Sequence, residues 1–229
     1  MEKPYLKKIK NISGHKVFLV DGQYIRNKID EEFTNFGQTY RFPFIPKGEF
    51  WIDREAKSGE DDYYIEHMIM EEKLMAKGMS YTEAIEKANK KEKVEREKSV
   101  IFSKLDQLSD EERIKKIHKK ILCSLGRIKV WLISGEAVRS LYFIDFTEGG
   151  HDKVYHFVPA NEVWIDDDLS TDERDFVLLH ELHERRLMAH GANYNEAHYP
   201  SSALEHFCRH HHFWLKPFLF GEKLLNLFV

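Results

Sequence analysis

Short apolar runs bounded by glycine, proline or asparagine recur along the chain, and such runs are typical of β-strands. They occupy Val17–Val20, Val130–Ile133, Leu141–Phe146, Val154–Val158 and Glu162–Ile165. Gly22 and Gly135 follow the first two runs, where we expect them to supply the positive φ of a tight turn. The pattern therefore predicts a small antiparallel sheet in each half of the chain.

A helical period replaces the short period after each group of predicted strands. The segment from Ser170 to Glu173 has the form of a capping box, which predicts a helix from about Thr171 to His190. Gly191 can close this helix in a left-handed conformation. Because residues 193–196 repeat the capping pattern, a second helix is expected directly after the turn.

The chain contains a tandem duplication. Residues 16–96 align without a gap with residues 129–209, and 27 of the 81 aligned positions are identical. Positions retained in both copies serve the shared unit, whereas positions that differ are candidates for a task of one copy. We predict an α+β protein of two tandem homologous units, each a small antiparallel sheet followed by a helix-turn-helix pair. The units are expected at 1–96 and 127–229, joined by a charged helical connector at 97–126.

Composition narrows the functional classes. A hydrophobic content of 42% with 32% charged residues is ordinary for a globular protein, and the net charge of −4 argues against general nucleic-acid binding. Cys123 and Cys208 lie at non-equivalent places and suggest no disulfide framework, so we expect a cytoplasmic protein. No membrane span is expected, because Lys216, Pro217, Glu222 and Lys223 interrupt the apolar C-terminal tail. We expect this tail to pack on the protein or to form an interface, through self-association or docking of a partner.

The predicted helix after Thr171 carries a histidine and a carboxylate on an apolar face. His180 and Glu184 lie one turn apart on the same side as Val177, while Leu178 and Leu182 form an apolar stripe on the opposite side. We therefore expect this helix to pack against other parts of the protein on both of these sides. A carboxylate in such an apolar environment needs a partner or a cation, and a metal ion is one such cation.

The segment His180-Glu181-x-x-Glu184 resembles the His-Glu-x-x-His motif of the zincin metallopeptidases, with Glu184 in place of the second histidine. The resemblance implies that His180 and Glu184 bind zinc, that Glu181 is the general base, and that a third ligand lies downstream. The two predicted helices and their Leu-Met-Ala-x-Gly turn also look like uncharacterised bacterial and phage proteins, which implies no activity.

His198 is the best candidate for the third ligand. Glu184 lies seven residues before Gly191 and His198 seven residues after it, so a helical hairpin brings the two side chains to a similar height. Glu205 lies further along the second helix. It is either a further ligand or the acceptor that orients His180.

The two copies differ at the candidate site. The equivalents of His180, Glu184 and Glu205 are retained in the first copy, whereas those of Glu181 and His198 are replaced; in the same order they are His67, Glu71, Glu92, Met68 and Ile85. This difference favours a zinc-dependent, metallopeptidase-like hydrolase, active in the second repeat only and acting on a peptide or protein substrate. The alternative is a non-enzymatic interaction or structural protein, in which His180 and Glu184 form a structural pair.

Overall fold

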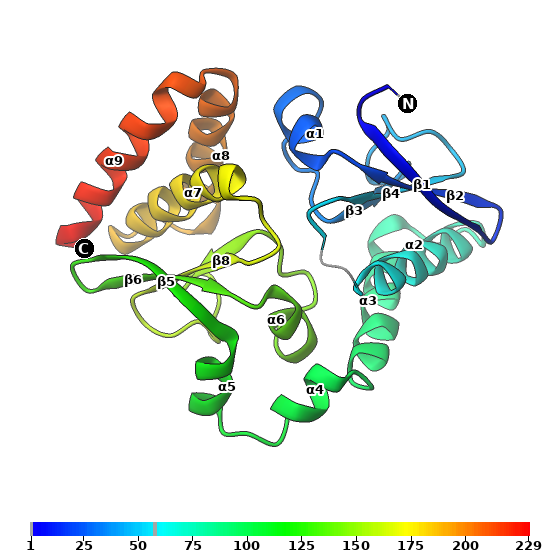
Figure 1. Cartoon of the computed structure of the whole chain (residues 1–229), viewed down its shortest axis with the longest axis horizontal. Coiled ribbons are helices and arrows are strands. Elements are labelled where there is room, and N and C mark those ends of the chain that lie inside the picture. Colours follow the sequence, from blue (N-terminus) through cyan, green and yellow to red (C-terminus); the bar gives the residue numbers. More distant parts are fainter. Residues whose placement is uncertain (1, 57–58) are drawn as a thin grey trace. The chain divides into compact units, whose positions relative to one another are not determined.

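The computed structural model describes residues 2–56 and 59–229, and the chain divides into two compact units (Figure 1). Unit 1 comprises Met1–Ser109 with Glu136–Asp145, and unit 2 comprises Asp110–Gly135 with Phe146–Val229. These units are defined by contacts between residues in space. The repeat boundaries at 96 and 126 come from the sequence alone, so they stay predictions. The predicted α+β class with two similar modules of sheet and helices is confirmed.

Each module contains a four-stranded sheet. The strands are β1 (Tyr5–Ile12), β2 (His15–Val20), β3 (Phe36–Gln38), β4 (Glu49–Asp53), β5 (His118–Leu125), β6 (Ile128–Ile133), β7 (Gly149–His151) and β8 (Glu162–Asp166). The spatial orders are β1-β2-β4-β3 and β5-β6-β8-β7. Every strand of the second sheet lies 113 residues after its counterpart in the first, so the two sheets are equivalent strand by strand.

The stretch expected to be a connector contains part of the second module. It includes α4 (Val100–Leu105) and α5 (Asp110–Ile117), and then β5, which pairs with β6. β5 lies 113 residues after β1, so the equivalence of the two sheets extends upstream of the aligned residues 16–96 and 129–209. The alignment missed β5 because the pairing of β1 with β2 and of β5 with β6 preserves backbone hydrogen bonds, which tolerate different side chains.

The central strands of each sheet are parallel, so the sheet is mixed rather than wholly antiparallel. β2 runs parallel to β4 and β6 runs parallel to β8, while the outer pairs are antiparallel. Short helices that the sequence analysis did not predict, α1 (Gly22–Lys28) and α6 (Gly135–Leu141), lie in the crossover connections. The strands predicted at 141–146 and 154–158 are wrong, since Phe146, Tyr155 and Phe157 instead pack ring against ring.

The glycine after β2 and β6 has a different role from the one expected. Gly22 and Gly135 are the first residues of α1 and α6 and do not have positive φ. A Cβ atom on Gly22 would lie 1.8 Å from Oδ2 of Asp53, and one on Gly135 would lie 1.9 Å from Oδ2 of Asp166. Glycine therefore allows the strand-end aspartate to approach the start of the helix.

Two longer helices follow each sheet. They are α2 (Asp61–Met75) and α3 (Tyr81–Arg96) in unit 1, and α7 (Thr171–Ala189) and α8 (Tyr194–His210) in unit 2. Their predicted starts are confirmed, because Ser170 and Asn193 accept hydrogen bonds from backbone N–H groups of the first turn. Gly191 lies in the turn between α7 and α8 with φ of 102°. Apolar residues of α7, including Val177 and Leu178, share a core with the sheet.

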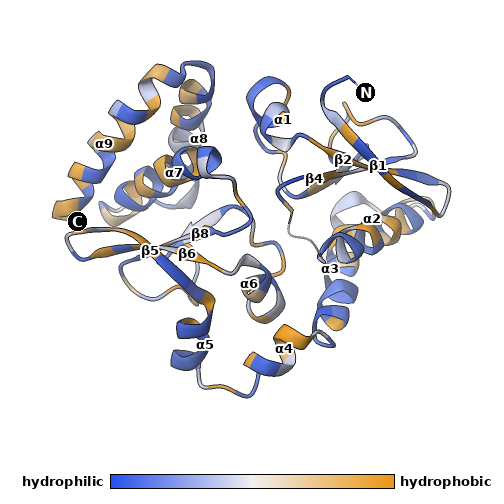
Figure 2. Cartoon of the chain, in the orientation of Figure 1, coloured by the Kyte–Doolittle hydropathy of each residue, from blue (hydrophilic) through white to orange (hydrophobic). Residues whose placement is uncertain are grey.

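The C-terminal tail packs back on unit 2. It contains η1 (His212–Trp214), α9 (Leu215–Leu225) and η2 (Asn226–Phe228), and α9 carries both hydrophobic and hydrophilic residues (Figure 2). Leu215 and Leu219 join the core formed with α7. Asn226 donates a hydrogen bond to the carbonyl of Leu182 at 3.1 Å. Among the described residues, we find no helix with the length and apolar character needed to cross a bilayer.

Candidate metal site

The structure places all five candidate residues on the paired helices of unit 2. His180, Glu181 and Glu184 lie on α7, and His198 and Glu205 lie on α8. The capped start of α8 and the preceding glycine turn set the height of the α8 residues relative to α7. The local signals in the sequence therefore determine which side chains face each other across the hairpin.

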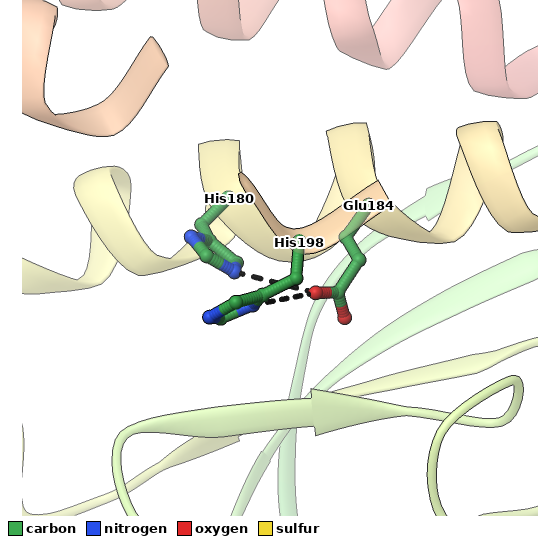
Figure 3. A group of neighbouring side chains, drawn as sticks. All are labelled: His180, Glu184 and His198. Atoms are coloured by element: carbon green, nitrogen blue, oxygen red, sulfur yellow. Dashed lines mark hydrogen bonds and ion pairs between the residues drawn. The ribbon is translucent and has the colours of Figure 1, made fainter. Parts of the chain in front are cut away.

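His180, Glu184 and His198 point toward one another and form a group of three candidate ligands (Figure 3). The Nδ1 atom of His198 lies 2.8 Å from Oε2 of Glu184, and Nε2 of His180 lies 3.6 Å from the same oxygen. The side chain of Glu184 is 4% exposed and that of His198 is 31% exposed. Solvent therefore reaches the group from the His198 side.

Glu205 lies behind His180 and outside this group of three. Its Oε2 atom accepts a hydrogen bond from Nδ1 of His180 at 3.0 Å. Its Oε1 atom is bound by Arg209 at 2.9 Å, and Arg209 also binds the buried carboxylate of Glu173. Because His180 donates to Glu205 through Nδ1, its other ring nitrogen, Nε2, faces Glu184. Of the two roles predicted for Glu205, the geometry matches the acceptor that orients His180.

His151 is a residue of this site that the sequence analysis missed. It is fully buried on β7, and its Nε2 atom lies 3.0 Å from Oε1 of Glu184, the oxygen that does not face His198. The duplication contained a signal for it, because a hydrogen-bonding side chain follows the shared glycine in both copies, at Gln38 and His151.

Glu181 is buried beside the same carboxylate. One of its oxygens lies within 4.8 Å of donor atoms of both His151 and Glu184. A Cβ atom at Gly149 would lie 3.2 Å from Cγ of Glu181, so the glycine on β7 makes room for this side chain. Burial raises the pKa of Glu181 to about 8, and the negative charge of Glu184 adds to that effect while His180 opposes it. Without a further cation beside it, Glu181 is therefore held mostly protonated at neutral pH.

The charges of His180 and Glu184 depend on each other. Burial opposes ionisation of Glu184, but hydrogen bonds from His151, His180 and His198 hold its pKa well below the usual range. Burial likewise opposes a positive charge on His180, whereas Glu184 and Glu205 raise the pKa of its imidazole well above 6.5. A metal ion bound at Nε2 must therefore displace a proton from His180.

Unit 1 retains the supporting interactions of this site. Nε2 of His67 lies 3.3 Å from Glu71, and its Nδ1 lies 2.8 Å from Glu92. Arg96 donates to Glu92 at 2.7 Å, as Arg209 does to Glu205 in unit 2. We call this set of four residues the His–Glu network, which comprises His67, Glu71, Glu92 and Arg96 in unit 1 and His180, Glu184, Glu205 and Arg209 in unit 2.

Apolar side chains replace the remaining site residues in unit 1. Met68 and Ile85 stand at the positions of Glu181 and His198, and Phe36 stands at the position of Gly149. The Phe36 ring lies edge-on to His67, with 5.4 Å between ring centroids. Unit 1 therefore has an aromatic side chain on β3 where unit 2 has the glycine that makes room for Glu181.

We expect the His–Glu network to make the stability of unit 1 dependent on pH. Burial opposes a charge on His67, but hydrogen bonds to Glu71 and Glu92 raise its pKa from 6.5 to about 9. The charged pairs therefore contribute fully below pH 6.5, and this contribution is lost as the pH rises through about 9. In urea denaturation at several pH values, wild-type protein should lose roughly 2–3 kcal/mol more over this range than the His67→Gln variant. Equal pH dependence of the two proteins would contradict the assignment.

Comparisons of the chain with protein-family models, with curated proteins and with solved structures gave no match. The resemblance to the zincin metallopeptidases therefore rests on the motif from His180 to Glu184 and on the residues that surround it.

Proposed function

We propose that unit 2 is a zinc-dependent hydrolase with metallopeptidase-like chemistry, acting on a peptide or protein substrate. Its zinc ligands are His180, Glu184 and His198. One observation carries the proposal: the polar residues Glu181 and His198, which unit 1 lacks, come from different helices and both lie beside Glu184. Chance substitutions on a structural scaffold have no reason to collect around one carboxylate.

The donor set and its spacing fit zinc. Two imidazoles and one carboxylate are a common set of protein ligands in catalytic zinc sites, which keep a further position for water or substrate. Donors at about 2.0–2.1 Å from a tetrahedral zinc ion lie roughly 3.3 Å from each other. The observed separations from Glu184 Oε2, 2.8 Å to His198 and 3.6 Å to His180, lie on either side of that value. Small side-chain movements are therefore enough to admit the ion.

Glu181 is the general base in this proposal. Zinc lowers the pKa of a water that it binds and polarises a substrate carbonyl. The added positive charge also lowers the pKa of Glu181, which burial otherwise raises to about 8. With zinc bound, Glu181 would have an ionised carboxylate beside Glu184, within 4.8 Å of one oxygen of that residue, and would be the group available to accept a proton from water.

A purely structural role is the second candidate function. The observation that favours it is the retention of the His–Glu network in unit 1, where Met68 and Ile85 leave no second histidine or base. In that case both networks stabilise the helix pair, and Glu181 and His198 are incidental. This candidate predicts that the protein binds no zinc.

Zinc content of protein purified without a histidine tag separates the two candidates. We expect one zinc per chain in the wild-type protein and none in the His198→Ala variant, because the remaining two ligands hold zinc weakly. Ile85→Ala is the matched control, since it changes the equivalent position of unit 1 and should leave the zinc content unchanged. Wild-type protein that stays free of zinc after incubation with a small excess of the ion would overturn the proposal.

Hydrolysis is tested with the zinc-loaded protein on labelled casein and on p-nitrophenyl acetate. Glu181→Gln should keep the zinc and lower the rate by about 10²-fold or more, as expected for loss of a general base. A zinc-dependent increase in folding stability without hydrolysis of either probe would instead indicate a metal that only stabilises unit 2.

A further inference from the structure

His151 makes one hydrogen bond on each side of its ring. The backbone N–H of Lys153 donates to Nδ1 at 3.1 Å, and Nε2 faces Oε1 of Glu184 at 3.0 Å. The ring is fully buried on β7. Both ring nitrogens are therefore engaged by groups of the protein itself.

These two contacts determine which nitrogen carries the proton. A backbone N–H group can only donate, so Nδ1 of His151 must be the acceptor and cannot carry a hydrogen. The hydrogen is then on Nε2, which donates it to Glu184. If Nε2 bound a metal instead, the ring would have no proton on either nitrogen, which is an unfavourable state for an imidazole.

Unit 1 repeats both hydrogen bonds with a different side chain. At the position of His151, Gln38 accepts from the backbone N–H of Tyr40 through Oε1 at 2.6 Å, and it donates from Nε2 to Glu71 at 3.0 Å. Tyr40 and Lys153 are equivalent in the duplication. A glutamine amide has one fixed acceptor and one fixed donor group. Gln38 therefore shows that this position needs an acceptor toward the backbone N–H and a donor toward the glutamate.

We propose that His151 is a positioning residue that holds Glu184 by one oxygen, so that only the other oxygen faces His180 and His198. This inference rests on the zinc site proposed above and deepens it. A carboxylate held in this way binds zinc through a single oxygen, which leaves a coordination position open for water or substrate. Three histidines surround Glu184, but two are ligands and the third controls the geometry.

Two variants of His151 test this role through metal binding rather than activity. His151→Gln preserves the acceptor and the donor, as Gln38 does, and should keep one zinc per chain with nearly unchanged affinity. His151→Leu removes both, and we expect zinc affinity to fall by about 10–100-fold, as is typical when a partner behind a ligand is lost. With cobalt in place of zinc, the visible spectrum of His151→Gln should match the wild type, while that of His151→Leu should weaken as Glu184 binds through both oxygens.

The controls separate this inference from the zinc site itself. His180→Gln removes a ligand and should abolish binding; if His151→Gln abolishes it equally, His151 is a ligand and the positioning role is wrong. Nitrogen-15 NMR of the imidazole rings in metal-free protein gives a readout that needs no metal. It should show the His151 proton on Nε2, and a proton on Nδ1 would overturn the inference whether or not zinc binds. Failure of the wild-type protein to bind zinc would overturn the proposed function but leave the NMR result to decide the hydrogen-bonding role.

Discussion

Replacement of Glu184 by alanine is expected to abolish zinc binding and to destabilise unit 2 by about 3–5 kcal/mol, the usual cost of removing one partner from a buried charged group. Glu184 is 4% exposed and lies within hydrogen-bond distance of His151 and His198. Its loss leaves the imidazolium of His180 with Glu205 as its remaining carboxylate partner in the network. Chemical denaturation and metal analysis of the metal-free and zinc-loaded protein measure the two effects separately.

Glu71→Ala is the matched variant in unit 1. Glu71 is buried and binds His67 and Gln38, so its loss should cost a similar free energy of unfolding. It should leave the zinc content at one per chain, because unit 1 supplies no ligand. Zinc binding that survives Glu184→Ala, or that is lost with Glu71→Ala in folded protein, would contradict the assignment of the site to unit 2.

A single substitution in unit 1, Ile85→His, is expected to raise the zinc content from one to two per chain. The His–Glu network of unit 1 already positions His67 and Glu71 as the equivalents of two ligands. Gln38 already donates to Oε2 of Glu71, whereas His67 faces Oε1. The missing element is the histidine that α8 supplies in unit 2, and position 85 on α3 is its counterpart.

This test is made specific by measuring the zinc content of Ile85→His both in wild-type protein and in the His198→Ala background. In the His198→Ala background, Ile85→His should restore one zinc, which must then be in unit 1, whereas Ile85→Asn should not. Phe36→Gly is tested in parallel, because the Phe36 ring lies edge-on to His67, one of the two ligand equivalents. If folded Ile85→His protein, with or without Phe36→Gly, binds no second zinc, the His–Glu network is not a sufficient frame for the metal, and the proposed ligand set loses its main structural support.

Local signals explain why much of the candidate site could be predicted. The caps at Ser170 and Asn193 and the glycine turn between the helices act within a few residues, so their sequence patterns determine helix ends directly. Counting outward from Gly191 then pairs Glu184 with His198, as the structure shows. The helical period likewise places His180 and Glu184 on one side of α7.

The sheet was harder to predict because its arrangement depends on distant residues. The parallel pairing of β6 with β8 needs a crossover, and the aromatic runs at 141–146 and 154–158 have strand-like composition but form no ladder. Apolar side chains can be buried through ring packing as well as in a strand, so composition alone does not distinguish the two. His151 was also missed because its contact joins distant residues: it reaches Glu184 from β7, 33 residues away along the chain.

The amino-acid sequence by itself determined the duplication, the paired helices, and the group formed by His180, Glu184 and His198, since each depends on residues close together in the chain or on the comparison of the two copies. Only the tertiary structure decided the mixed sheet, the hydrogen bond between His180 and Glu205, and the approach of His151 to the second oxygen of Glu184. These features depend on which faces of separate elements meet, and that outcome follows from packing and burial of the whole unit rather than from any local pattern.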